Sequence, residues 1–171
     1  YAISAEGGEA RQVSPDGLSC TGAAVSPDGE MVAFLGNPTA EMGYDVVGLY
    51  LAPLAGGPAE RVDRNWDRSF SDETVTDLCP PAGGGLVWAP DGSAIYAVSS
   101  VGGTTQLVRV DVSTGEVTML TRGDRQVYSF SLDAACRWAV LGVSTPLNPG
   151  DVYRFNVTEG TEERLTDVNG A

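Results

Sequence analysis

The sequence predicts an all-β chain, a partial β-propeller of about three four-stranded antiparallel blades preceded by an N-terminal half-blade hairpin. Three observations support this fold class. The 171 residues include 22 Gly and 10 Pro, which punctuate many short strands. No long stretch has the apolar period of an amphipathic helix. Turn signals and the strands around them recur at the interval of a propeller blade, roughly 40 to 50 residues.

Residues 85–121 are the clearest single unit. Four short runs rich in β-branched and aromatic residues are separated by turn sequences, which is the pattern of a four-stranded meander. The first run ends at the Pro-Asp-Gly of residues 90–92, where Pro favours a type I turn and Gly accepts the exit. In the third run Val108 and Val110 alternate with polar or outward neighbours, which predicts a half-buried strand.

The unit is repeated, as it must be if each blade is to bury its faces. Two ungapped matches give outer hairpins: residues 110–121 with 155–166, and residues 1–13 with 50–62. The Pro-Asp-Gly signal also recurs at residues 27–29 and, in degraded form, as the Leu-Asp-Ala of residues 132–134. In this alignment Asp133 takes the place of Asp91.

These repeats divide the chain into six segments. In order, they are the outer hairpin of a truncated blade (1–13), a blade (14–62), a long acidic loop between blades (63–85), a blade (86–126), a blade (127–166) and an exit segment (167–171). The loop is an insertion, since the interval between the first two blade signals is longer than the next.

The inserted loop holds the candidate functional residues. Long loops on a rigid scaffold often carry binding side chains, and Trp66, Asp67 and Arg68 lie together in this one. Trp66 either attaches the loop to the propeller or presents a contact surface, and both interpretations remain open. Asp63, Asn65 and Asp67 have the spacing of a calcium loop, but the required Gly and bidentate Glu are absent, so no metal site is expected.

Charge and composition exclude several functions. The chain carries 23 acidic residues against 10 basic ones, a net charge of −13, so neither nucleic acid nor an anionic membrane is an expected partner. It contains no His, and all its basic residues are Arg, so a Ser-His-Asp triad cannot be assembled. Residues 17–22 resemble a nucleophile elbow only superficially and are interpreted as a turn. No catalytic residue and no cofactor site is expected.

The cysteines indicate a reducing compartment. Cys20, Cys79 and Cys136 are odd in number and widely spaced, unlike a disulfide framework or a metal-ligand motif. The chain start has no features of a signal peptide, and no apolar run is long enough to cross a bilayer. The cysteines favour a cytoplasmic location.

The motifs together resemble a known family. They are the blade signals at 26–29 and 88–92, the loop sequences 64–69 and 76–78, and the tail sequences 146–151 and 164–169. In this order they resemble the N-terminal β-propeller, with WD40-like or TolB-like repeats, of acylaminoacyl-peptidase-type members of the prolyl oligopeptidase (S9) family of serine peptidases.

The resemblance implies a non-catalytic role for this chain. In that family a propeller caps a C-terminal α/β-hydrolase domain that carries the catalytic triad, and no position here matches a catalytic motif. The implied partners are that hydrolase domain, which the exit segment 167–171 would adjoin, and the small peptides whose access the propeller would restrict. No cofactor is implied.

Two other functions compete with this one. A free-standing TolB-like propeller would bind a protein partner, and a following Gly-x-Ser-x-Gly motif would discriminate against it. A propeller enzyme such as an oligogalacturonate lyase shares the blade pattern but would need metal-ligating His residues. Blade faces left bare in a partial propeller also predict self-association.

Overall fold

Every regular element in the described residues is a β-strand, which confirms the predicted all-β class. The computed structural model describes residues 1–38, 45–63, 65–75 and 85–170; Cys79 and part of the predicted 63–85 loop lie outside them. The strands are β1 (Ser19–Val25), β2 (Met31–Asn37), β3 (Gly48–Pro53), β4 (Glu60–Arg61), β5 (Val87–Trp88), β6 (Ala94–Val101), β7 (Thr104–Asp111), β8 (Val117–Met119), β9 (Gln126–Leu132), β10 (Trp138–Thr145), β11 (Asn148–Asn156) and β12 (Glu162–Arg164).

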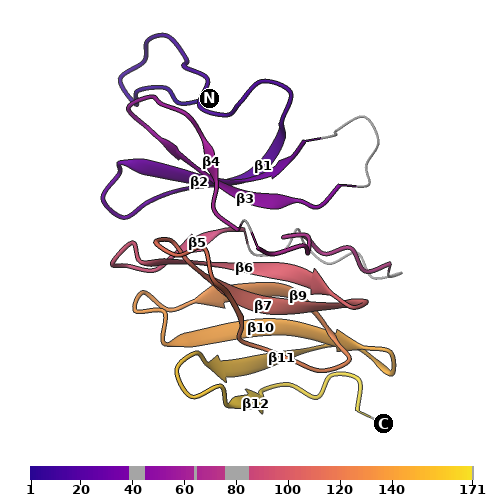
Figure 1. Ribbon diagram of the computed structural model, residues 1–171. Helices are drawn as coiled ribbons and strands as arrows, with labels where there is room; N and C mark the ends of the chain where they lie inside the picture. Colours follow the sequence, from indigo (N-terminus) through magenta and orange to yellow (C-terminus); the bar gives the residue numbers. More distant parts are fainter. Residues whose placement is uncertain (39–44, 64, 76–84, 171) are drawn as a thin grey trace.

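The strands form three antiparallel meanders that succeed one another along the chain. We call β1–β4 the first sheet, β5–β8 the second and β9–β12 the third; within each, consecutive strands are paired. A single parallel bridge, Thr105 to Gln126, joins the second sheet to the third. Figure 1 shows the sheets stacked in chain order, from the N-terminal end at the top to the C-terminal end at the bottom, without closure into a ring.

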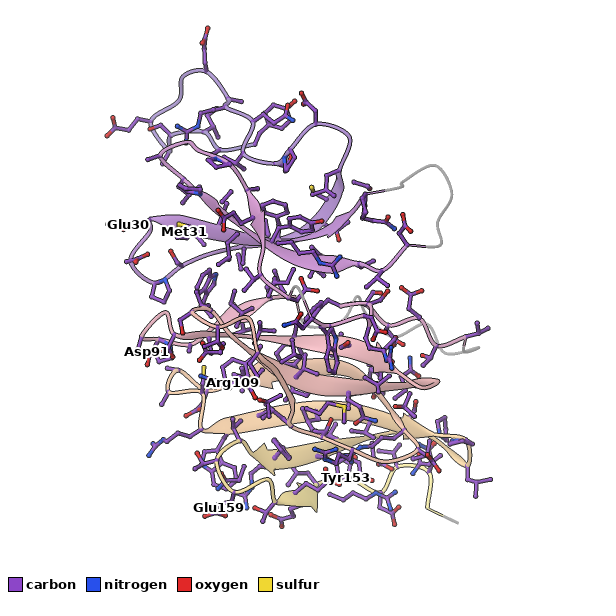
Figure 2. The ribbon with its side chains drawn as sticks, in the orientation of Figure 1. Glu30, Met31, Asp91, Arg109, Tyr153 and Glu159 are labelled. Carbon is purple, nitrogen blue, oxygen red and sulfur yellow. The ribbon has the colours of Figure 1, made fainter. Side chains whose placement is uncertain are left out.

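The two Pro-Asp-Gly sequences form the same turn. Gly29 N donates to Ser26 O and Gly92 N donates to Ala89 O, both at 2.9 Å. Both glycines have left-handed φ values, 75° and 73°, which non-glycine residues adopt at a cost. Glu30, which follows the first turn, and Asp91 of the second lie on the same side of the stacked sheets (Figure 2).

The third turn corrects the predicted alignment by two residues. Cys136 N donates to Asp133 O, and Asp133 N donates to Trp138 O, so Asp133 corresponds to Ala89 rather than to Asp91. Cys136, with φ 52°, therefore occupies the position of Gly92. The sequence alignment failed here for two reasons. A cysteine, not a glycine, is the left-handed turn residue. Asp133 lies at the start of the turn, where its side chain accepts hydrogen bonds from Arg137 N and Trp138 N.

The predicted turn over residues 17–22 is wrong from Ser19 onwards. Ser19, Cys20 and Thr21 belong to β1 and pair with the last residues of β2. The apolar β2 runs on to Asn37 and so offers β1 a longer partner than expected. A bulge between Thr21 and Ala24 absorbs Gly22, whose φ is 62°.

The apolar core lies between the sheets rather than within any one of them. Ala33 and Leu49 of the first sheet pack against Ile95 and Val108 of the second, with Phe70 among them. A separate cluster joins Ala94, Tyr96 and Leu107 of the second sheet to the third: Val127, Phe130, Ala139, Leu141, Val143 and Phe155. Alternate residues of β6 therefore face opposite neighbours, as a strand's period of two requires.

Strand β7 is buried on both faces, so the prediction of a half-buried strand is wrong. Leu107 faces the third sheet, whereas Val108 and Val110 face the first, and all three are fully buried. A strand with neighbours on both sides needs apolar residues on both faces. The alternation of valines with Arg109 concealed this, because Arg109 lies only half-buried near the strand end.

The N-terminal residues 1–13 make a looser hairpin. Ala2 and Arg11 form an isolated antiparallel bridge, and Arg11 Nη1 donates to Ala55 O at 2.6 Å. Val13 packs with Val32 and Phe34 on the face of the first sheet that points away from the second.

Candidate functional site

Residues 63 and 65–75, here called the crossing segment, run from the first sheet to the second. Its start is fixed by Asp63, which is fully buried. Asp63 Oδ1 accepts from Leu49 N at 2.9 Å, while Arg61 Nε and Nη2 donate to its two carboxylate oxygens at 3.1 and 2.9 Å. This pairing raises the pKa of Arg61. A buried carboxylate with a bidentate Arg partner fixes the direction in which the chain leaves β4.

Trp66 attaches the crossing segment to the second sheet. Its indole Nε1 donates to Ser99 Oγ in β6 at 3.0 Å, and its half-buried ring packs on the cluster between the first and second sheets. Of the two interpretations left open by the sequence, this contact is the one expected of an attachment point.

Asp67 and Arg68 point away from that contact. Both are exposed, and they pair with each other, Arg68 Nη1 with Asp67 Oδ1. The three residues that the sequence groups are thus divided, with Trp66 directed at the core and the other two at solvent. A surface contact through Asp67 and Arg68 stays a prediction.

The middle of the crossing segment is bound on both sides. Phe70 N donates to Val47 O at 2.9 Å, and the Phe70 side chain lies in the core between the first two sheets. Ser69 O accepts from Ser99 Oγ and from Ser100 N, both at 2.9 Å. The segment therefore joins the first sheet to β6.

Asp72 extends this attachment to the third sheet, which the sequence did not signal. Thr105 Oγ1 in β7 donates to its Oδ1 at 2.7 Å, and Gln126 Nε2 in β9 donates to its Oδ2. Burial opposes ionisation of Asp72, but hydrogen bonds from Thr74, Gln126 and Thr105 outweigh it and hold its pKa below the usual value. Asp72 lies where the second and third sheets meet at their single bridge.

Two of the cavities that flank the segment are larger than the third, which lies beside Asn65 and Trp66. One, of about 520 Å³, lies between the first sheet and the β7–β8 turn of the second, and its lining includes Met31, Leu51, Arg61 and Asn65. The other, of about 570 Å³, lies between the second and third sheets; its lining includes Thr74, Thr104, Arg125, Gln126, Ser144 and Thr145. We call the second the Arg125 cavity. Its wall combines hydroxyl and amide groups with the charged Asp124 and Arg125 and the apolar Val75 and Pro146. Gln126 Oε1 accepts from Ser144 Oγ at 3.0 Å.

The described residues contain no cluster of three or more His, Cys, Asp or Glu side chains arranged to hold a metal ion. No helix among the described residues could cross a membrane. The side chains gathered at the crossing segment are hydroxyls, amides, carboxylates and guanidinium groups, which bind and orient but, without His, do not form a Ser-His-Asp triad.

Comparison with known proteins identifies the fold of the chain. No family model matches the chain. Dipeptidyl-peptidase 5 of Porphyromonas gingivalis is 27% identical over 146 residues, which are 85% of this chain and 19% of that protein. The chain thus spans less than a fifth of the length of this curated relative.

Solved structures agree on the architecture. A TolB-type protein from Agrobacterium tumefaciens matches 91% of this chain and 49% of its own (TM-score 0.67, 21% identity). A puromycin hydrolase matches 91% of this chain and 23% of its own (TM-score 0.64, 20% identity). The β-propeller domain of the trilobed protease from Pyrococcus furiosus matches 87% of this chain and 40% of its own (TM-score 0.58, 20% identity).

The fold is therefore a partial β-propeller, as predicted. The expected resemblance is also confirmed, since prolyl endopeptidases and the acylaminoacyl peptidase of Pyrococcus horikoshii have the same fold, with TM-scores of 0.62 and 0.57 at 18% and 20% identity. The chain is similar to the propellers of prolyl oligopeptidase-type serine peptidases.

Proposed function

We propose that this chain is a non-catalytic β-propeller part of a serine peptidase of the acylaminoacyl-peptidase or prolyl-oligopeptidase kind. It docks on an α/β-hydrolase domain and restricts access to that domain to small peptides. The observation that carries the proposal is the recurrence of peptidases among proteins of this fold, together with a curated dipeptidyl-peptidase relative of which the chain covers 19%. The absence of His from the chain supports a non-catalytic part.

The organisation predicted from the repeats belongs to this proposal. Residues 14–62, 86–126 and 127–166 are its blades, residues 1–13 an outer hairpin, and residues 167–171 the exit towards the hydrolase domain. The segment 63–85 is its loop between blades, with Trp66, Asp67 and Arg68 as the candidate contact residues. A cytoplasmic location is proposed on the cysteines, of which exposed Cys20 and buried Cys136 are free thiols.

A free-standing TolB-like binding propeller is the second candidate. It is favoured by the fit to the TolB-type protein, of which this chain matches 49%. A manganese-bound oligogalacturonate lyase also has this fold, with a TM-score of 0.55 and 21% identity. The lyase interpretation is weaker, because this chain has no His to bind the metal.

A serine-directed fluorophosphonate probe tests the main proposal. We expect the probe to label the longer protein that contains this chain and to leave the isolated chain unlabelled. Labelling of the isolated chain would overturn the non-catalytic role, and a longer protein that is not labelled would favour the TolB-like candidate.

Access is tested in the longer protein by comparing kcat/KM for an acylated tripeptide and for the same sequence inside a 40-residue peptide, a length chosen as roughly that of one blade. We expect cleavage of the short peptide only. Replacement of Asp72 by Ala, which releases the crossing segment, should raise activity on the long peptide. Equal cleavage of both peptides by the unaltered protein would contradict restricted access.

Self-association through the outer face of the third sheet is a further part of the proposal. Trp138 and Val140 are 39% and 45% exposed there, and they correspond to Ala94 and Tyr96, which the second sheet buries against the third. Sedimentation of the isolated chain should show association that strengthens with salt, as screening weakens the repulsion between chains. A strictly monomeric chain at high protein concentration would rule this out.

A further inference from the structure

Arg125 has a guanidinium edge without a ligand. Its Nη1 donates to Glu162 Oε1 at 2.7 Å, but its Nε is buried and has no hydrogen-bond partner among the described residues. It is the one buried side-chain nitrogen or oxygen in the described part of the chain with no partner. A buried donor without an acceptor is costly, so it calls for a physical explanation.

Arg61 shows how the same edge looks when it is occupied. There the Nε–Nη2 edge holds both oxygens of the Asp63 carboxylate, at 3.1 and 2.9 Å. This is the geometry that a planar guanidinium offers to a planar carboxylate. Arg125 instead donates to Glu162 from Nη1, which is not part of the Nε–Nη2 edge. On this edge, the one that binds Asp63 in Arg61, the Nε of Arg125 lacks an acceptor.

Arg125 lines a cavity large enough for a ligand. The Arg125 cavity holds about 570 Å³, which falls within the usual size of small-molecule sites. The hairpin turn at Gly102 and Gly103 is part of its lining, and Cβ atoms added there would meet nothing within 4 Å. Thr104 and Ser144 add hydroxyl groups to the wall.

We propose that the Arg125 cavity binds a peptide carboxylate, held by the Nε–Nη2 edge of Arg125. The side chain keeps 12% of its surface exposed, and binding requires the guanidinium to turn its buried Nε towards the cavity. The carboxylate is either a peptide C-terminus or an acidic side chain, since the two share the same chemistry. Carboxylate binding at this cavity is independent of the proposed peptidase role.

The surrounding charges tune this site. Glu162 neutralises part of the Arg125 charge, and the exposed Asp124 lines the same cavity. Both weaken attraction of an anion, so affinity should be low, with short-range hydrogen bonds rather than net charge providing selectivity. Replacing Asp124 by Asn should therefore tighten binding, most clearly at low ionic strength.

Arginine side-chain NMR of the 171-residue chain provides the test. The Nε–H signals of Arg125 and Arg61 are followed while three probes are added: acetyl-trialanine with a free carboxylate, its C-terminal amide, and acetyl-Ala-Glu-Ala amide. We expect the Arg125 signal to move with one or both acids and not with the trialanine amide, and the two acids distinguish the sources. The Arg61 signal should not move, because the Arg61 side chain is already bound to Asp63.

Two variants at matched positions complete the experiment. Arg125→Gln should weaken binding at least about tenfold, as expected for loss of a charged hydrogen-bonded pair. Arg122→Gln removes the same charge from an exposed residue three positions away and should change affinity less than about twofold. If Arg125→Gln fails to fold, the Arg125 signal and the tighter binding expected of Asp124→Asn still decide the question.

The proposal is overturned by any of three results: an Arg125 signal that none of the acids moves, an Arg61 signal that moves as much, or equal losses in the Arg122 and Arg125 variants. The last two would indicate diffuse electrostatic attraction in place of a site.

Discussion

The first sheet differs from the other two at one repeated position. In each sheet this position follows the residue at the end of the fourth strand that bonds to the third strand of the same sheet. Backbone bonds define the equivalence: Val62, Leu120 and Leu165 each donate N–H to the third strand, at 2.9, 2.9 and 2.8 Å. The residue after each of them then caps the N–H of a third-strand residue. In the second and third sheets that residue is Thr, and in the first it is Asp63.

The second and third sheets use the hydroxyl in two directions. Thr121 Oγ1 accepts from Leu107 N and donates to Gln106 Oε1; Thr166 Oγ1 accepts from Val152 N and donates to Asp151 Oδ1. The third sheet adds Arg164, whose Nη2 donates to Asp151 Oδ2. One Thr thus satisfies both a backbone donor and a side-chain acceptor.

The first sheet also caps the third-strand N–H, but its carboxylate lies at the capping position itself rather than on the third strand. Asp63 caps Leu49 N, and Gly48 occupies the place of Gln106 and Asp151. The side chain of Arg61, the counterpart of Arg164, fills the space beside Gly48 and pairs with Asp63. The backbone requirement is therefore common to all three sheets, while the residues that meet it exchange positions.

Arg61→Met should destabilise the chain most. Met is the residue of the second sheet at this position, Met119, but the first sheet still has the buried Asp63. The fully buried carboxylate loses its cation, and we expect unfolding free energy to fall by about 3 kcal/mol. Urea denaturation followed by tryptophan fluorescence measures the change. Arg68→Met breaks an exposed pair and should cost about 0.5 kcal/mol or less; equal losses would show that the two pairs do not differ.

Gly48→Gln should come next in size. A Cβ at Gly48 would lie 2.6 Å from Arg61 Nε, so overpacking should cost about 2 kcal/mol. In the Arg61→Met background the space is open and Gln can donate to Asp63, so the cost should shrink. A double-mutant cycle measures this coupling, and strictly additive losses would mean that Arg61 does not occupy the place of the missing side chain.

Thr121→Val and Thr166→Val compare the two Thr caps. Val keeps the shape but leaves Leu107 N and Gln106 Oε1 without a partner; since Thr121 is 2% exposed, we expect a loss of about 2 kcal/mol. Thr166 is half-buried, so water can replace its hydroxyl and the loss should be about 1 kcal/mol. Thr118→Val, on an exposed position of β8, is the control; a loss as large as that of Thr121→Val would remove the cap as the cause.

The sequence predicted what depends on local chemistry. Pro-Asp-Gly turns and alternating apolar residues are set by neighbouring residues, so strands and two of the three blade turns could be predicted. The third turn could not, because Cys136 adopts a left-handed φ that sequence patterns assign to Gly. The burial of β7 on both faces depends on neighbouring sheets.

The candidate site was predicted less well than the fold. Trp66, Asp67 and Arg68 are adjacent in sequence, yet only Trp66 contacts the core. Asp72 and Arg125 gave no signal, because their roles arise from residues of three different strands brought together by sheet stacking. A single acidic or basic residue in a loop carries no sequence pattern that would distinguish it from a solvated one.

Lowering the pH should affect the second and third sheets differently. In the third sheet the Thr hydroxyl donates to a carboxylate, Asp151, whereas in the second it donates to an amide, Gln106. Hydrogen bonds to Asp151, first from Thr166 and also from Val168, Asn148 and Arg164, hold its pKa well below the usual value. A lowered folded-state pKa gives stability that is complete above the unfolded value, about 4, and is lost as pH falls towards the folded one. The stability difference between the unaltered chain and Asp151→Asn should therefore shrink as pH falls below about 4.

Urea midpoints at several pH values between about 6 and 2.5, spanning the unfolded Asp pKa, measure this difference. Asp124→Asn, which alters an exposed carboxyl outside the capped pairs, is the control. A constant difference for Asp151→Asn would mean that the charge on Asp151 does not stabilise the third sheet, and that its Thr cap works as the uncharged one of the second sheet does.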